Sequence, residues 1–448
     1  MILYWIIFLI ISFFAIKDWK RTCIIWMPLH LLFNESVCLK YTSPAISFVF
    51  AVDSLLFFLF YVKKRKYQLN NCTYFFKTAF IAYLISYGIS MLFSIVPFTE
   101  VFANTIKYFI QNFIIVYLFQ RALYNKEDIK LFLKTGLIVV ILIISLGLYE
   151  TIFKDNPVLD YVYLNAPKEL IQGKMYYVPP FASYTEAVSM RFGLVRAYSF
   201  FGIHIAFGCA SILLFYLYFY FYNQKNNLLN KKWLLLGCIL LITGVFMCNS
   251  KTPLLAIPFF VLATFKPKSL FNPKLIASFI ILIILISIYA PEYFNNFKAI
   301  FDSQLAEQGG GSNTSMRIQQ FQVGLNLFNM SPLWGNGVGA IGVFMKNASN
   351  ADLLGAESSW LKILPERGLI GAIVYLILYH QIYIKLKTVL KKKEVIGFLA
   401  GLMIMETATG FMDFALYGAI TICLYRFQQL NKNNSLPQTK PSHKISNN

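Results

Sequence analysis

The sequence has few charged residues and especially few acidic ones. Asp and Glu total 20 among 448 residues, charged residues make up 13%, and apolar residues reach 58%. A soluble domain carries about 25% charged residues, so too few polar side chains are present to coat a water-soluble globule. The mean hydropathy of +0.59 agrees with this. These values exclude soluble, collagen-like and disordered chains and indicate a polytopic membrane protein.

Residues that bind metals are also sparse. The chain has seven Cys and four His, with no CxxC pair and no His spacing typical of zinc. No Asp-x-Asp metal-binding pair is visible either. We therefore expect no metal and no cofactor, and we expect the Cys residues, most of which lie in or beside apolar runs, to be buried free thiols.

Positive charge, in contrast, is abundant and unevenly placed. The net charge is +20, from 40 Lys and Arg against 20 Asp and Glu. Most of the excess lies in short clusters between apolar runs, at 17–21, 63–66, 121–134, 225–232, 266–274 and 385–393. Retention of positive charge on the cytoplasmic side of spanning helices produces this distribution. The basic charge thus predicts a lipid bilayer as partner, and no nucleic acid.

Apolar runs that cross or nearly cross a bilayer core of about 30 Å recur along the chain. They are 1–16, 44–62, 75–96, 101–119, 131–152, 202–222, 233–248, 253–265, 274–291 and 361–384, with a shorter piece at 22–33. The run at 395–425 is too long for one straight crossing of the membrane. The polar break from Glu406 to Asp413, with Gly410, predicts a hairpin of two short spans there. We predict an all-α, polytopic transmembrane helical bundle of about 12 spans. It forms one integral membrane domain over 1–431, followed by a disordered cytoplasmic tail over 432–448.

Two large extracytoplasmic loops follow from this topology, at residues 153–201 and 292–358. Long loops in compact proteins usually carry function. In the first loop, Arg191 and Arg196 are five residues apart, about 140° around a helix, so one helical face cannot present both. They pair with Glu186 or lipid head groups, or they clamp phosphate oxygens, which suit the planar fork of Arg. His204, at the start of the next span, either assists at the site or is structural.

The sequence of the second loop predicts a helix that begins near Ser315 and stops at Pro332. Arg317 lies in its first turn, where a helix N-terminus favours anions. The apolar residues of this helix recur at helical spacing, at Ile318, Phe321, Leu325 and Phe328. A glycine-rich run over 335–342 follows. It predicts a flexible turn that lets the backbone approach a ligand.

Glu357 lies at the mouth of a span, after apolar and small residues. Partial loss of water there raises a carboxyl pKa, which suits a general base near neutral pH. The alternative is an interfacial Glu paired with Lys362 or Arg367. The next residue, Ser358, has no His-Asp accompaniment, so a nucleophilic serine is poorly supported.

Together these features resemble the superfamily of bacterial O-antigen polymerases and O-antigen ligases, membrane glycosyltransferases of the GT-C type. The resemblance is carried by the arginine pair, by Arg317 with Pro332-Leu-Trp-Gly-Asn-Gly337, and by Glu357-Ser-Ser-Trp-Leu with Gly368-Leu-Ile-Gly371. In the ligase branch the third motif resembles His-Asn, so Glu357 is more similar to the polymerase branch. Lys251 stands where many relatives have Arg after a Ser.

The resemblance implies an inverting, metal-independent transfer of a glycan from undecaprenyl diphosphate to an acceptor glycan. Arg191, Arg196 and Arg317 would bind the diphosphate, and Glu357 would take the proton of the acceptor hydroxyl. The supporting residues would be His204, Ser358 and Arg367. The expected location is the bacterial inner membrane, with the site facing the periplasm and a chain-length regulator as a further partner.

The leading hypothesis is a polymerase of O-antigen or capsular repeat units. An O-antigen ligase that transfers polymer to lipid A–core is the alternative within the same chemistry. A lipid-linked oligosaccharide flippase is the alternative from another class. A transporter is expected to show repeats and mid-membrane charges, whereas this chain has no convincing repeat and carries Arg in its outer loops.

Overall fold

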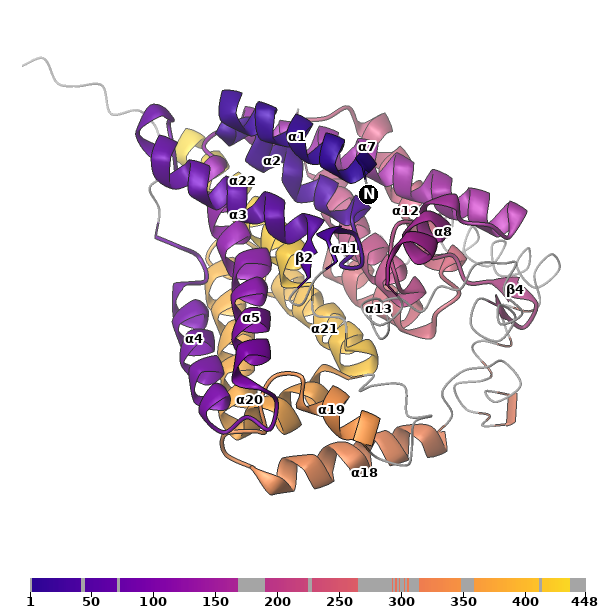
Figure 1. Ribbon diagram of the computed structural model, residues 1–448. Coiled ribbons are helices and arrows are strands. Elements are labelled where there is room, and N and C mark those ends of the chain that lie inside the picture. Colours follow the sequence, from indigo (N-terminus) through magenta and orange to yellow (C-terminus); the bar gives the residue numbers. More distant parts are fainter. Residues whose placement is uncertain are drawn as a thin grey trace, which may run out of the picture.

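The structure is a computed structural model that describes residues 2–41, 45–70, 73–167, 190–224, 228–264, 314–347, 358–410 and 413–435, with isolated residues between 292 and 305. Helices dominate this part of the chain, and the few strands form two short hairpins (Figure 1). The elements before the first long loop are α1 (Ile2–Lys17), α2 (Trp19–Leu29), η1 (His30–Leu32), β1 (Cys38–Lys40), β2 (Ile46–Ser47), α3 (Phe48–Lys63), η2 (Lys64–Lys66), α4 (Lys77–Leu92), α5 (Phe98–Tyr108), η3 (Phe109–Ile114), α6 (Ile115–Ala122), α7 (Lys126–Phe153) and α8 (Pro157–Asn165).

After that loop, the chain forms a second hairpin and a second group of helices. The elements are β3 (Met190–Arg191), β4 (Leu194–Val195), α11 (His204–Asn223), α12 (Lys231–Met247), α13 (Lys251–Thr264), α18 (Thr314–Met330), α19 (Ala340–Asn347), α20 (Ser359–Leu386), α21 (Lys392–Thr409) and α22 (Phe414–Ser435). The predicted run at 274–291 lies outside the described residues. The predicted disordered tail 432–448 begins too early, because residues 432–435 form the last turn of α22; the rest of the tail lies outside the described residues.

Four described helices are long and apolar enough to cross a membrane. They are Phe98–Ala122, Lys126–Phe153, His204–Asn223 and Ser359–Leu386. Ile2–Lys17, Lys77–Leu92 and Lys251–Val261 are apolar but shorter. The protein is therefore a multi-pass, mostly helical membrane protein, and the total of about 12 spans stays a prediction.

The sequence correctly predicted the break inside 395–425. Helix α21 ends at Thr409, and Gly410 follows with a φ of 64°. Glycine adopts this left-handed conformation without a Cβ clash, which is why it ends helices so often. Helix α22 then begins at Phe414. The predicted buried thiols are also confirmed for the six described cysteines, Cys23, Cys38, Cys209, Cys238, Cys248 and Cys423.

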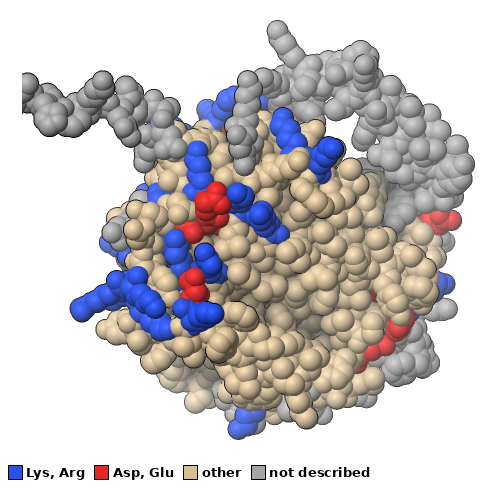
Figure 2. All heavy atoms as spheres, turned by 90° about the horizontal axis from the view of Figure 1, so that it is seen from above, with Lys and Arg blue, Asp and Glu red and all other residues tan. Residues whose placement is uncertain are grey.

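The basic ends of the helices come together on one side of the bundle. Contacts that join different helices there are Lys20 Nζ to Asp128 Oδ2 (2.8 Å), Arg426 Nη2 to Tyr124 O (2.8 Å) and Lys432 Nζ to Thr388 O (2.6 Å). In Figure 2 the Lys and Arg side chains cluster on part of one face, and broad neighbouring areas carry no charge. This is the arrangement expected where positive residues stay on one side of a membrane.

Further contacts join helix ends away from these basic residues. Ser90 at the end of α4 donates to Glu366 O in α20 (2.7 Å), and Ala197 N donates to Met247 O at the end of α12 (3.0 Å). Helices α4, α5 and α20 run side by side, and α18 packs across α20 (Figure 1). The placement of two large loops at these ends stays a prediction.

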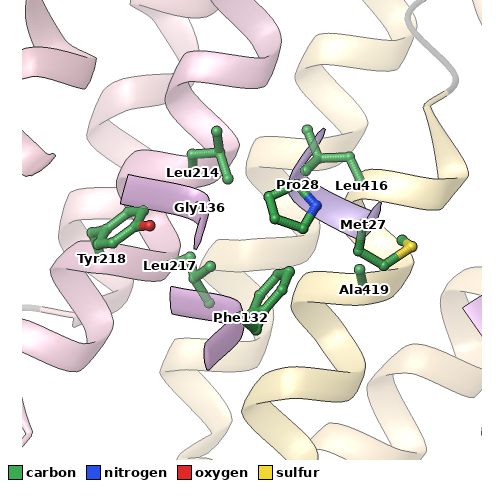
Figure 3. A pocket seen from close by; sticks show the side chains of 9 residues that line it. All are labelled: Met27, Pro28, Phe132, Gly136, Leu214, Leu217, Tyr218, Leu416 and Ala419. Atoms are coloured by element: carbon green, nitrogen blue, oxygen red, sulfur yellow. The ribbon is translucent and has the colours of Figure 1, made fainter. Parts of the chain in front are cut away.

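A small cavity in the core is apolar. It lies where α2 meets α7, α11 and α22, and its lining is Met27, Pro28, Phe132, Gly136, Leu214, Leu217, Tyr218, Leu416 and Ala419 (Figure 3). The one hydroxyl among these side chains, that of Tyr218, donates to Leu133 O at 2.8 Å. With no free polar group to orient a ligand, this cavity is a packing feature of the core.

Candidate active site

A short antiparallel hairpin carries the first arginine pair. Strands β3 and β4 pair Met190 with Val195 and Arg191 with Leu194. The two turn residues, Phe192 and Gly193, have φ values of 50° and 77°. Positive φ at both central residues is typical of the tight turn that suits the twist of a two-residue hairpin. The segment is therefore not helical here, as the spacing of the arginines had allowed.

The hairpin and the residue that follows it carry both arginines. Arg191 pairs with Leu194 across the turn, and Arg196 comes directly after β4, which ends at Val195. Both residues are buried, at 8% and 6% exposed. The turn reverses the chain between the two arginines, which a helix with this spacing does not do.

His204 belongs to the same cluster. Both guanidinium groups lie close enough to act electrostatically on its imidazole. The ring of Tyr198 lies edge-on to the imidazole, with 5.3 Å between the ring centroids. His204 is the first residue of α11, so the cluster is positioned by the end of a helix as well as by the hairpin. Three of the predicted site residues are therefore brought together.

The turn between α12 and α13 holds the hairpin from the other side. Asn249, buried and with a φ of 46°, donates from Nδ2 to Arg191 O at 3.2 Å. Arg196 also lies close to Cys248. Sequence reasoning did not single out Asn249. The available signal was a polar Asn-Ser-Lys sequence between two apolar runs, at the end of the bundle where positive charge is rare.

The second loop forms the predicted helix. Helix α18 spans Thr314–Met330 and contains Arg317 in its first turn, although the side chain of Arg317 lies outside the described part of the chain. The helix packs against α20 through Gly324, where an added Cβ would lie 3.4 Å from Leu361 Cδ2. The predicted apolar residues Ile318, Phe321 and Leu325 are exposed.

The glycine-rich run packs closely against another segment of backbone. Its predicted approach to a ligand stays a prediction. A Cβ on Gly335 would lie 2.3 Å from Arg367 N, and a Cβ on Gly368 would lie 2.4 Å from Leu333 O. Asn336 N donates to Pro365 O at 2.9 Å. The turn therefore packs on a break in α20, where Gly368 has a φ of 63° and a ψ of −163°.

Glu366 completes this packing. Its Oε1 accepts a hydrogen bond from Gly339 N at 3.0 Å, and its carbonyl oxygen accepts one from Gly337 N at 3.0 Å. The side chain is 4% exposed. The Pro-Leu-Trp-Gly-Asn-Gly motif and the Glu-Arg-Gly motif are thus two halves of one structural unit. Figure 1 shows α19, which follows the turn, beside α20.

Arg367 lies in the core of the bundle. Its guanidinium carbon is 5.1 Å from the ring centroid of Tyr83 and 4.8 Å from that of Tyr87, both on α4. The side chain is 3% exposed. These contacts with the two tyrosines join α20 to α4. Sequence reasoning, which grouped Arg367 with the loop residues, lacked any signal for this aromatic surrounding.

The proposed base itself is not described by the structure. Glu357 lies outside the described residues, while its neighbour Ser358 is the N-cap residue of α20 and is 9% exposed. Among the described residues, no group of three or more His, Cys, Asp or Glu side chains is placed to hold a metal ion. The chemistry that the described residues support is therefore anion binding by the paired guanidinium groups.

Comparison with known proteins finds a family for part of the chain. Residues 236–376 match the family described as O-antigen ligase. The chain carries a domain of the O-antigen ligase and polymerase superfamily. This O-antigen ligase domain begins inside α12 and ends inside α20, so it includes Asn249, Arg317, Ser358 and Arg367. Arg191 and Arg196 precede it. No curated protein matches the chain.

Proposed function

We propose that this protein polymerises oligosaccharide repeat units that are linked to undecaprenyl diphosphate, at the outer face of the bacterial inner membrane. The observation that carries the proposal is the pair of buried arginines, Arg191 and Arg196, which both lie near His204. This cluster lies at the end of the bundle opposite the basic helix ends. A site on that side has access to a glycan lipid in the outer leaflet.

In the proposed reaction, an acceptor sugar hydroxyl attacks the anomeric carbon of the donor. The bond from that carbon to the phosphate oxygen breaks, and the carrier diphosphate leaves with the electron pair. Arg191, Arg196 and Arg317 bind the diphosphate and stabilise the charge that develops on it, which is usually the largest catalytic contribution. Glu357 accepts the hydroxyl proton. Attack opposite the leaving group inverts the anomeric configuration.

The supporting residues act in different ways. His204 lies beside both hairpin arginines, where a neutral imidazole donates or accepts a hydrogen bond without adding charge. Ser358 occupies the N-cap position of α20 directly after Glu357, and its backbone carbonyl accepts a hydrogen bond from Lys362 N at 3.2 Å. Arg367 acts from the core, because its contacts with α4 hold the broken helix on which the glycine-rich turn packs.

A ligase remains the second candidate, because the matched family is described as O-antigen ligase. Deletion of the gene, followed by gel analysis of surface glycan, separates the two. A single repeat unit on the acceptor indicates that the polymerase is lost. Bare acceptor, with long polymer retained on the lipid carrier, indicates a ligase. Loss of all translocated repeat units indicates a flippase and overturns both transferase assignments.

The role of Glu357 is tested separately by the Glu357→Gln variant. We expect polymer extension to stop while the protein still inserts in the membrane, because the amide keeps the shape but does not accept the proton. Glu100→Gln is the matched control, since Glu100 is an exposed carboxylate in the first turn of α5 at the same end of the bundle. Polymer of normal length in Glu357→Gln would remove this residue from the mechanism.

A further inference from the structure

A buried carboxylate on α7 lies behind the arginine hairpin. Glu150 is 3% exposed, and its Oε2 accepts three hydrogen bonds. The donors are Tyr198 N, Ser199 N and Asn156 Nδ2, each at 2.9 Å. Hydrogen bonds to an ionised carboxylate are stronger than those to a neutral acceptor. Two of the donors are the backbone amides of consecutive residues. One side chain therefore fixes the path of the chain at residues 198 and 199.

Two neighbouring side chains complete this arrangement, which we call the Glu150 clamp (Glu150, Asn156 and Ser199). Asn156 Nδ2 also donates to Ser199 O at 2.8 Å, and Ser199 Oγ donates to Ile143 O at 2.7 Å. Asn156 and Ser199 are both fully buried. Ser199 has a φ of 55°, a conformation that a residue other than Gly keeps only where its surroundings enforce it.

The clamp holds the short segment that joins two parts of the candidate site. Arg196 lies two residues before Tyr198, and His204 lies five residues after Ser199. The clamped Tyr198 also places its ring against the imidazole of His204. A shift at the clamp would therefore move the guanidinium group and the imidazole relative to each other.

We propose that Glu150 is a positioning residue for diphosphate binding, because it sets the geometry of the Arg191–Arg196 pair through the backbone of residues 197–199. This inference rests on the proposed function only in naming the diphosphate as the ligand. A role limited to stabilising the fold would change the unfolding temperature of Glu150 variants but not the affinity for diphosphate in the folded protein. A positioning role changes the affinity as well.

The experiment compares Glu150→Leu, Glu150→Gln and wild type in the full-length protein in detergent. The Leu side chain is of similar size and accepts no hydrogen bond, whereas Gln keeps one acceptor oxygen. We expect amide hydrogen exchange over residues 197–201 to accelerate in Glu150→Leu. We also expect its affinity for undecaprenyl diphosphate to fall by up to about 100-fold, since small misplacements of binding groups have effects of this order. Glu150→Gln is expected to show a smaller change of the same kind in both measurements.

Glu127→Gln is the matched control, because Glu127 is on the same helix but its side chain is 75% exposed at the basic end. It should match wild type in both measurements. If amide hydrogen exchange over residues 197–201 accelerates in Glu150→Leu but the diphosphate affinity is unchanged, the positioning role is overturned. If the exchange is unchanged, the clamp itself is overturned. If Glu150→Leu fails to fold, the same two measurements on Glu150→Gln test the positioning role. Wild-type protein that binds no undecaprenyl diphosphate would instead contradict the proposed function.

Discussion

The guanidinium group of Arg367 lies over the ring of Tyr87, with its central carbon 4.8 Å from the ring centroid. A cation over an aromatic face is attracted by the ring quadrupole, and the attraction grows when water is excluded. Both residues are buried. This contact connects the break in α20 to α4, and the same break receives the glycine-rich turn. The position of the second loop therefore depends on an interaction inside the membrane domain.

A double-mutant cycle measures this contact. We expect Arg367→Met and Tyr87→Leu to be coupled by about 1–2 kcal/mol in the free energy of unfolding, the size found for desolvated cation–π pairs. Thermal or denaturant unfolding of the purified protein in detergent gives the four values. Lys64 over Tyr61 provides an exposed control pair, for which the coupling should be smaller. Additive effects of the Arg367 and Tyr87 substitutions would show that the contact contributes nothing.

Gly335→Ala tests the packing of the turn on α20. The new Cβ would lie 2.3 Å from Arg367 N and 2.4 Å from Glu366 O, and the φ of 77° is itself unfavourable for Ala. We expect a loss of about 2–4 kcal/mol in the free energy of unfolding from strain and overpacking. Gly342→Ala is the matched control, since a Cβ there meets nothing within 4 Å. Equal stability of both variants would contradict the described packing.

Arginine-to-lysine substitutions test the anion site. In Arg191→Lys, Arg196→Lys and Arg317→Lys the positive charge stays, but the bidentate fork is lost. We expect each to lower kcat/KM for the lipid-linked donor on the order of 100-fold, as removal of one preorganised donor to a developing anion does elsewhere. Arg21→Lys, at a side chain 76% exposed on the basic side, should leave the rate unchanged. Full activity in the three variants would reduce these residues to a general charge effect.

The hydropathy pattern, together with the residues that begin or end helices, predicted much of the helical fold. The apolar runs correspond to helices wherever the structure describes them, and the break at Gly410 was predicted because Gly suits the left-handed end of a helix. The helix that carries Arg317 was predicted from its capping residue and its periodicity. These features are local in the chain, so local sequence is sufficient to specify them.

The aromatic surroundings of Arg367 and the contacts of Glu150 were not predicted. Arg367 meets residues of α4 that are far from it in the sequence, and Glu150 meets backbone amides of a segment beyond the first long loop. Neither contact leaves a periodic or compositional signal. Gly335 and Gly337 were predicted to form a turn that permits close approach, but the sequence did not show that the turn packs on the backbone of α20, because glycine permits close approach to any backbone.

By itself, the sequence determined that this protein is a mostly helical membrane protein, and it predicted basic connections on one side and two polar loops on the other. Apolar content and charge placement control partition into a bilayer and need no knowledge of packing. Only the tertiary structure decided that Arg191 and Arg196 both lie near His204 and that Arg367 belongs to the core. Strand register and helix packing set those relationships, and both depend on contacts between segments distant in the chain.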